Sequence, residues 1–383
     1  PRAVAAIPGL PLARHEPWLQ GLGAFRVSQI AVDHFPLQVW SGLVARHGRN
    51  PRASQLQYGH PLGDLRFRET LAAYLRTSRG VRCTPEQILV TSGSQHALAI
   101  AARVLLDPGD EVWVEEPGYP GARDALAISG ARLVPVPVDE EGLDVAAGVA
   151  RSPQARAAYV TPSHQYPLGA TLTASRRLQL LDWAQHSGAW ILEDDYDSEY
   201  RYESQPIAAL QGLDRDSRVV YIGTFSKVLF PALRTGYLVA PADLVSRFAA
   251  VRAAIDDFPP ALYQAVLTDF LAEGHFARHL RRMRLLYRER RGALVEALRS
   301  EPGTSLQVLG ERAGMHLTAI LESGACDRRI SEQAASQGLW AMPLSACYLA
   351  EPSRSGLVLG YGGTGIPEIL DGVRRLGRLL REG

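Results

Sequence analysis

Residues Tyr221–Leu238 read YIGTFSKVLFPALRTGYL and contain Lys227, the only lysine in a chain whose lysines and arginines total 41. A G+C-rich coding sequence is the simplest explanation for arginine at the other positions. A guanidinium does not deprotonate in a protein, whereas a buried ammonium can. A neutral amine is required for addition to a carbonyl, which gives a Schiff base. Composition alone also fits a surface lysine kept by chance, so the neighbouring residues decide.

The residues around Lys227 suit a phosphate group. Thr224 and Ser226 precede it and Arg234 follows it, and two hydroxyls with a guanidinium are good phosphate ligands. A second candidate is TSGSQHAL, in which a strand is expected to end at Val90 and a helix to begin at Ser94. The first amides and the positive dipole end of such a helix attract anions, although many α/β turns share this pattern.

Two further stretches suit an aromatic cofactor. In WILEDDYDSEY, Asp194 and Tyr196 point the same way on an extended strand. Such a carboxylate suits a protonated pyridine nitrogen, and the tyrosine suits a ring hydroxyl; an acidic loop that binds solvent or a cation is the alternative. In EEPGYPGAR, Tyr119 follows a strand and suits stacking on a planar ring, or it is a simple turn aromatic.

Short apolar strands alternate with helices between about residues 88 and 240, which is typical of buried parallel strands in a three-layer α/β domain. A long helical stretch, 261–299, then leads into candidate strands in MHLTAIL and LVLGYGG. We expect an N-terminal arm or linker over 1–33, a large cofactor-binding domain over 34–275 and a small α/β domain over 276–383.

An aldehyde-trapping lysine, a phosphate site, an acid for a pyridine nitrogen and a stacking aromatic are all expected at strand ends of one sheet. Together they favour pyridoxal 5′-phosphate (PLP), a cofactor for which a protein supplies a Schiff-base lysine and a partner for the pyridinium. Each signal is weak alone, and their combination and order carry the prediction.

The bulk composition narrows the setting. The formal net charge of +1 argues neither for nor against nucleic acid. Cys83, Cys326 and Cys347 form no C-x-x-C pair, so we expect a reducing compartment without a disulfide framework or a zinc site. No leader and no membrane-length apolar run is evident, which predicts a cytoplasmic protein. Because the chain starts with Pro1 and has no methionine before Met283, we expect it to be processed or truncated.

At this point the sequence resembles the fold-type I PLP family, the aspartate aminotransferase superfamily, and more closely the aminotransferase-like domain of the MocR/GabR transcriptional regulators. The resemblance covers most of the chain. Its phrases are YGHPLGDLRFRETLAAYLRTSRGVRCTPEQILVTSGSQHAL, EEPGYPGAR, TPSHQYPLG, EDDYDSEYRY, YIGTFSKVLFPALRTGYLVAP, FLAEGHFARHLRRMR and GMHL.

The resemblance implies a role for each candidate residue. Lys227 would form the internal aldimine, Asp194 would pair with the pyridine nitrogen, and Tyr196 would reach the 3′-oxygen. Tyr119 would lie over the ring. The phosphate would be held by Ser94, Gln95, Thr224, Ser226 and Arg234, with Tyr58 contributed by the other subunit of a homodimer. Such regulators bind DNA through an N-terminal winged helix, for which we see no room before Tyr58.

The chain departs from the aminotransferase pattern at two places, one at the cofactor and one at the substrate. Tyr166-Pro167-Leu168-Gly169 stands where many of those enzymes have Asn-Pro-Thr-Gly, so the usual asparagine contact to the 3′-oxygen is lost. Val358 stands at about the position of the arginine that binds the substrate α-carboxylate, and a valine has no charge to offer. Arg123 and Arg354 are candidate substitutes, although a surface arginine is the simpler interpretation of each.

Three functional hypotheses follow. The first is a ligand-sensing domain of a MocR-type regulator, which binds PLP through Lys227 and responds to an amine or amino-acid effector or to PLP itself. The second is an autonomous PLP-dependent aminotransferase, with Lys227 also acting as general base. The third is a dimerisation scaffold without PLP, against which the retained lysine argues. The missing carboxylate arginine favours the sensor.

Overall fold

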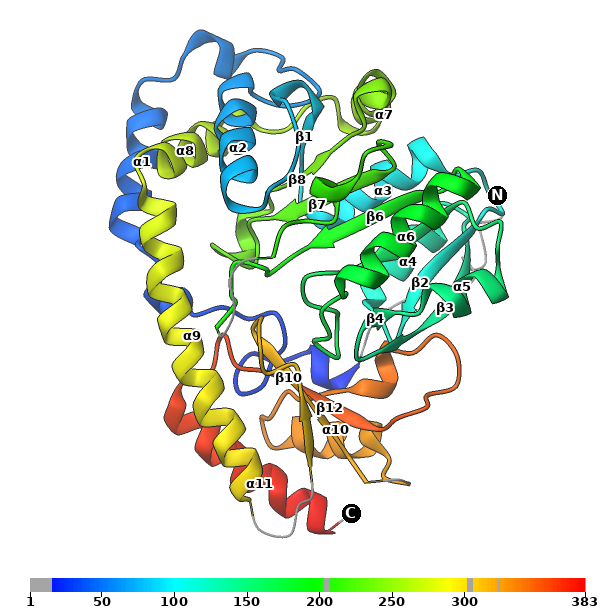
Figure 1. Ribbon diagram of the computed structural model, residues 1–383. Helices are drawn as coiled ribbons and strands as arrows, with labels where there is room; N and C mark the ends of the chain where they lie inside the picture. Colours follow the sequence, from blue (N-terminus) through cyan, green and yellow to red (C-terminus); the bar gives the residue numbers. More distant parts are fainter. Residues whose placement is uncertain (1–15, 203–206, 302–305, 323, 383) are drawn as a thin grey trace, which may run out of the picture.

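The computed structural model describes residues 16–202, 207–301, 306–322 and 324–382. These residues form an eight-stranded sheet and a four-stranded sheet, with the long helix α9 (His275–Ser300) running alongside (Figure 1). Residues 1–15 of the expected arm lie outside the described residues. The rest of the arm is partly buried, and Phe25 pairs with Gly360 of the smaller sheet.

The large sheet has the strand order β1-β8-β7-β6-β5-β2-β3-β4. Its central strands β7, β6, β5, β2 and β3 are parallel, which confirms the mostly parallel sheet predicted from the sequence. β8 runs antiparallel because it follows β7 through a short return rather than through a covering helix. The strands are β1 (Ile88–Thr91), β2 (Glu111–Glu116), β3 (Arg132–Asp139), β4 (Gly142–Leu143), β5 (Ala157–Val160), β6 (Trp190–Asp195), β7 (Val219–Thr224) and β8 (Gly236–Val239).

Helices cover both faces of this sheet, because successive side chains of a buried strand point to opposite faces. On β2, Val112 and Val114 join the apolar cluster formed with α3 (Ser94–Leu105), α4 (Pro120–Ile128) and α7 (Val245–Asp256). Trp113 points the other way and stacks on Trp183 of α6 (Ala174–Ser187), with α5 (Val145–Arg151) beside it. The three-layer α/β arrangement is therefore as predicted.

The predicted helical stretch 261–299 is two helices rather than one. α8 (Ala261–Ala272) ends before Gly274, which adopts a φ of +75° that favours glycine and separates α8 from α9. α1 (Leu37–Arg49) and α2 (Leu65–Ser78) pack near α8, where Trp40 stacks on Tyr263.

The smaller sheet is antiparallel, in the order β11-β12-β10-β9. Its strands are β9 (Gln307–Leu309), β10 (His316–Ile320), β11 (Met342–Pro343) and β12 (Gly356–Gly360). Leu317 and Leu359 face the core that contains α9, α10 (Asp327–Ser336) and α11 (Ile366–Glu382). Val358 faces the opposite way, into a cluster with Trp18 and Tyr166. The smaller sheet thus packs against the loop that follows β5.

None of the helices in the described part of the chain combines the length and apolar character that a bilayer span requires.

Candidate functional site

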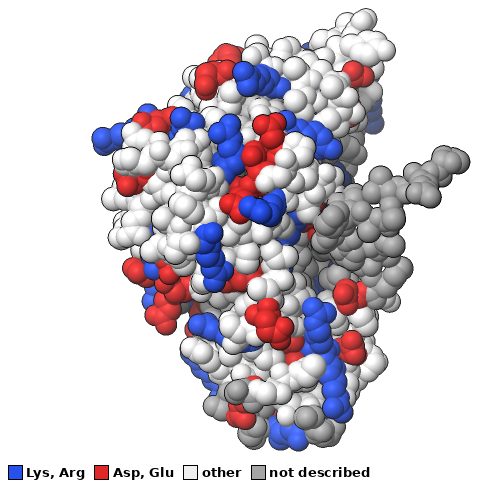
Figure 2. Space-filling view, turned by 90° about the vertical axis from the view of Figure 1, so that its right-hand side faces the viewer, with Lys and Arg blue, Asp and Glu red and all other residues white. Residues whose placement is uncertain are grey.

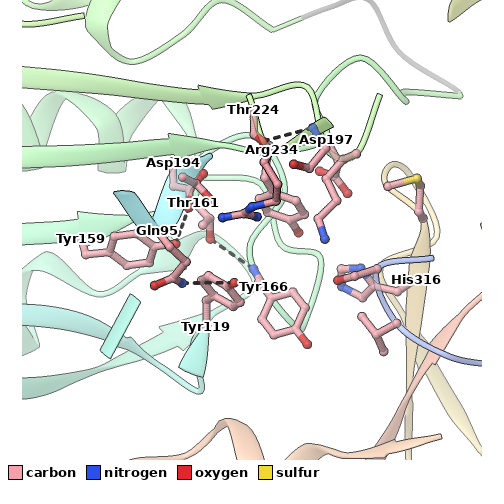
Figure 3. A pocket seen from close by; sticks show the side chains of 17 residues that line it. Gln95, Tyr119, Tyr159, Thr161, Tyr166, Asp194, Asp197, Thr224, Arg234 and His316 are labelled. Carbon is pink, nitrogen blue, oxygen red and sulfur yellow. Dashed lines mark hydrogen bonds between the residues drawn. The ribbon is translucent and has the colours of Figure 1, made fainter. Parts of the chain in front are cut away.

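A pocket lies at the carboxyl ends of β5, β6 and β7, which meet at one edge of the large sheet (Figure 3). Nine of the ten residues predicted for the cofactor line it. They are Ser94, Gln95, Tyr119, Asp194, Tyr196, Thr224, Ser226, Lys227 and Arg234. The tenth, Tyr58, is 85% exposed and packs edge-on against Phe258, so one chain alone does not bring it to the pocket.

Lys227 lies in the turn after β7 and faces the pocket. Burial lowers the pKa of its ammonium to about 8, although the carboxylates of Asp197 and Asp194 partly offset that effect. A sizeable fraction of the side chain is therefore neutral near pH 8. The position has the chemistry that the sequence required of a nucleophilic amine.

The phosphate candidates meet at one end of the pocket. Arg234 Nη2 donates to the Ser92 carbonyl at 2.7 Å, and the Ser226 amide donates to Thr224 Oγ1 at 3.2 Å. Gly93 precedes α3 with a φ of +100°, and a Cβ there would meet Arg234 Nη2 at 3.2 Å. Ser226 Oγ is buried without a hydrogen-bond partner among the described residues. An anion at the start of α3 fits these donors.

The carboxylate of Asp194 can bind a cationic group in the pocket. Its Oδ2 accepts a hydrogen bond from the Tyr159 hydroxyl at 2.9 Å, whereas its buried Oδ1 has no partner among the described residues. Burial raises the pKa of this carboxyl to about 7. A protonated pyridine nitrogen would complete its hydrogen bonding and favour its ionised form. Gln95 Nε2 lies 3.3 Å from the Tyr119 hydroxyl at the side of the pocket. The donor set therefore fits PLP.

The other end of the pocket has, among the described residues, no lining arginine that could bind the carboxylate of an amino acid. Tyr166 and His316 lie there, away from Thr224 and Arg234 (Figure 3). Val358 is fully buried, and the Tyr166 hydroxyl lies 3.4 Å from Met342 Sδ in the same apolar cluster.

Neither arginine considered as a substitute lines the pocket. Arg123 is buried and donates to the Gly118 carbonyl at 2.8 Å, and Arg354 is exposed.

Arg26 is a residue that sequence reasoning missed. Its Nη1 donates to the Trp18 carbonyl at 2.9 Å. Burial lowers the pKa of its guanidinium, and its charge in turn contributes to the lowered pKa of Lys227. Its neighbours Val27 and Ser28 line the pocket. No motif marks this position, because residue 26 lies far from Lys227 in sequence.

Other pocket residues were also not singled out from the sequence. Tyr159, Thr161, Asp197, Met315 and His316 line the pocket as well. Asp197 stands within the quoted WILEDDYDSEY, but it follows the end of β6, where strand alternation no longer predicts a direction. That Asp197 lies near Lys227 could be seen only in the tertiary structure.

Comparison with known protein families matches residues 33–356 to aminotransferase class I and II. The chain belongs to this family. Solved structures of similar fold include LysN, an α-aminoadipate aminotransferase of Thermus thermophilus, at 31% identity, with a TM-score of 0.87 over 95% of this chain and 93% of that one. Kynurenine aminotransferase of Pyrococcus horikoshii has 28% identity and a TM-score of 0.86 over 93% of this chain and 89% of that one. The fold-type I prediction is confirmed.

Within this aminotransferase family the chain is similar to transcriptional regulators. The probable rhizopine catabolism regulatory protein MocR of Rhizobium meliloti is 42% identical over 92% of this chain and 71% of that protein. The uncharacterised HTH-type regulator YdeL of Bacillus subtilis is 34% identical over 92% of this chain and 75% of that protein. The resemblance to MocR-type regulators is thus confirmed.

The description of the kynurenine aminotransferase names PMP, and that of LysN names N-(5′-phosphopyridoxyl)-L-leucine. Both compounds are derivatives of PLP. With the family and the donor set of the pocket, they confirm PLP as the cofactor predicted from the sequence.

Proposed function

We propose that the chain is the PLP-binding, effector-sensing and dimerisation domain of a MocR-type transcriptional regulator. The observation that carries the proposal is the pairing of a cofactor site, centred on Lys227, with an apolar cluster that contains Val358 and the pocket residue Tyr166. The similarity to HTH-type regulators over 92% of the chain supports it.

When bound, PLP supplies an aldehyde carbon that is open to attack by an amine. Lys227 would attack as the neutral amine that its lowered pKa permits. Asp194 would hold a proton on the ring nitrogen, and the start of α3 with Arg234 would anchor the phosphate. A free amine or amino acid that displaces Lys227 is the effector in this proposal, and PLP occupancy itself is the second form of signal.

The ligand end of the pocket supports sensing over turnover. The family resemblance implies an arginine on β12 that would bind both oxygens of a substrate α-carboxylate. Val358 is instead fully buried among apolar side chains and offers no such contact. Substrate positioning contributes much of an enzyme's rate, so a ligand held without this clamp is expected to react slowly.

A steady-state assay tests the proposal. Purified protein with PLP is incubated with an L-amino-acid donor and a keto-acid acceptor, while the visible spectrum is recorded with a panel of primary amines and amino acids. A spectral response to at least one amine, without repeated turnover, is expected. Turnover at about one per second or faster would contradict the sensor and support the enzyme.

An autonomous aminotransferase remains the second candidate because one observation favours it. Lys227, Asp194 and Tyr196 line one pocket, which is what proton transfer at a bound amino acid requires. The 2-aminoadipate transaminase of Thermus thermophilus is 31% identical over 94% of this chain and 90% of that protein. The turnover assay above separates the two candidates.

A homodimer belongs to the proposal. Leu37, Leu56 and Tyr58 are 66%, 74% and 85% exposed, which is unusual for large apolar side chains unless a partner covers them. Analytical ultracentrifugation is expected to show a dimer. If Tyr58 of the partner subunit reaches the phosphate, Tyr58→Ala lowers PLP affinity in the dimer; an unchanged affinity would place the phosphate contact elsewhere.

The division at residues 275 and 276 is likewise proposed as functional. Met315 and His316 bring the smaller sheet to the pocket, so closing that sheet over a ligand is the movement we propose as the signal.

DNA contact is proposed through a separate winged-helix domain. On the face shown in Figure 2, basic and acidic side chains are interspersed rather than gathered into one basic patch. Sequencing the gene upstream of the codon for Pro1 tests this part directly.

A further inference from the structure

His164 lies behind Tyr196, outside the set of side chains that line the pocket. Its Nδ1 is 3.1 Å from the Tyr196 hydroxyl oxygen and 3.1 and 3.2 Å from the two carboxylate oxygens of Asp197. The side chains of His164 and Asp197 are 1% and 2% exposed. Three oxygens therefore converge on one ring nitrogen in a site shielded from water.

Glycine at 314 makes room for this arrangement. A Cβ at that position would lie 2.4 Å from His164 Nδ1 and 2.7 Å from Asp197 Oδ2, closer than any side chain tolerates. Gly314 also adopts a φ of +79°, which favours glycine. The loop before β10 is thus shaped around the His164–Asp197 pair, although neither residue is near it in sequence.

Counting protons decides how the three groups are linked. An ionised carboxylate only accepts hydrogen bonds, so His164 must carry a proton on Nδ1 to bond with Asp197. That proton leaves no lone pair on Nδ1 for the Tyr196 hydroxyl. The hydrogen of Tyr196 must then point elsewhere, and its oxygen has no other partner among the described residues. Because Tyr196 lines the pocket, the pocket is where its O–H is directed.

The surroundings keep Tyr196 in its donor form. Burial and the neighbouring Asp197 raise the pKa of its hydroxyl well above the ordinary value. The other titratable groups that interact with Tyr196 or Asp197 include Tyr166, Asp194, Glu115, Lys227, Arg201, Tyr200, Tyr202 and Tyr361. The His316 ring centroid lies 5.0 Å from that of His164.

We infer that His164 and Asp197 are positioning residues that fix the proton of Tyr196, so that its hydroxyl donates to the ring oxygen of bound PLP. This inference rests on the proposed function. The YPLG turn in the loop after β5 lacks the asparagine that contacts the 3′-oxygen in many aminotransferases. In this inference the loop acts on the same oxygen indirectly, because His164 positions Tyr196. His164 Nε2 is buried without a hydrogen-bond partner among the described residues.

The pH dependence of the visible absorbance of the PLP-loaded protein tests the inference. A hydrogen-bond donor to the ring oxygen of PLP stabilises the negative charge on that oxygen and so favours the deprotonated form of the bound cofactor. Removing the donor therefore raises the pH at the midpoint of the absorbance change. Tyr196→Phe is expected to raise it by about one pH unit, and His164→Leu by about half a unit or more in the same direction.

His164→Asn is the conservative variant. Its amide nitrogen stands near the position of Nδ1 and can still donate to Asp197. We expect a midpoint within about 0.2 units of the wild type, well below the effect of losing the hydrogen bond.

Combining His164→Leu with Tyr196→Phe distinguishes an effect of His164 on the Tyr196 hydroxyl from a direct electrostatic effect of Asp197. Leucine at 164 also leaves Asp197 without its partner, which alters the charge felt by Lys227 whether or not Tyr196 is present. If His164 acts through Tyr196, most of its shift disappears in the Tyr196→Phe background. A shift of equal size in both backgrounds, or no shift in His164→Leu, would overturn the inference.

Two further measurements test the inference even if the His164→Leu variant misfolds. Gly314→Ala displaces the His164 ring and should reproduce the upward shift, whereas Gly292→Ala, where a Cβ meets nothing within 4 Å, should leave the midpoint unchanged. In the cofactor-free wild type, ¹⁵N spectra of labelled histidine, assigned with His164→Asn, should show His164 protonated at Nδ1. Protonation at Nε2 alone would contradict the inference. A wild type without a visible PLP band would instead overturn the proposed function itself, and the inference with it.

Discussion

The two ends of the pocket have different characters. At the cofactor end, polar groups from the start of α3, the end of β6 and the connection between β7 and β8 converge, and Ser226 Oγ and Asp194 Oδ1 have no hydrogen-bond partner among the described residues. At the opposite end, Tyr166 lines the pocket and belongs to an apolar cluster that also contains the buried Val358. The cofactor end fits PLP, whereas the ligand end has Val358 where the aminotransferase resemblance implies a carboxylate-binding arginine.

This difference shows that binding a cofactor and choosing a ligand are separable in one fold. Lys227 is shared by both ends, because a reactive amine serves a sensor and an enzyme alike. Function therefore has to be argued from the ligand end. The following predictions test each end in turn.

The largest effect is expected at Lys227. Lys227→Arg keeps the positive charge but cannot supply a neutral amine, so the PLP-dependent visible band and covalently attached cofactor should both be lost. Lys227→Ala should behave in the same way. Absorbance, and mass spectrometry after borohydride reduction, measure the two losses. A covalent chromophore that survives in either variant would mean that another residue holds the cofactor.

A charge placed at the ligand end should be the next most harmful change. Val358→Arg buries a guanidinium among apolar side chains, and an unpaired buried charge costs about 3–5 kcal/mol. Urea unfolding of the cofactor-free protein measures this loss, with Val358→Ala as the control for lost packing. A Val358→Arg variant as stable as the alanine variant would show that this end already accommodates an ionic partner.

At the phosphate end, Arg234→Gln should weaken PLP binding without preventing it. Losing one charge-assisted hydrogen bond costs roughly 1.5–3 kcal/mol, or about 10- to 100-fold in affinity. Equilibrium titration of cofactor-free protein gives the dissociation constant. Arg354→Gln, an exposed arginine outside the pocket, is the matched control. Equal affinities for the two variants would remove Arg234 from the phosphate site.

The smallest effect concerns pH. The pKa of Lys227 is lowered to about 8, so the neutral amine, and with it the rate of PLP uptake, should rise about tenfold from pH 7 to pH 9 and then level off. Stopped-flow absorbance measures the rate. Because the charge of Asp197 raises this pKa, Asp197→Asn should move the midpoint downward. A wild-type rate still rising above pH 10 would indicate an ordinary lysine.

The sequence by itself predicted the cofactor and the large sheet, and nine of the ten residues that it proposed for the cofactor line one pocket. Lys227 stood out because arginine cannot replace a reactive amine, and Asp194 because a strand end fixes the direction of its side chain. Strand-and-helix alternation likewise predicted the parallel sheet, since both signals are local. The break at Gly274 in the expected long helix was not predicted from the sequence, because its cause, a φ of +75° at this glycine, is seen only in the structure.

Only the tertiary structure decided the rest. Arg26, His164, Asp197 and Gly314 come from four separate segments that meet around Lys227 and Tyr196. No local pattern relates these segments. The contact of His164 with Asp197 follows from the pairing of β5 with β6, and Gly314 reaches both residues from the loop before β10. Local residue chemistry thus identified the cofactor, whereas the groups that control its ring oxygen and its ligand depend on contacts between distant parts of the chain.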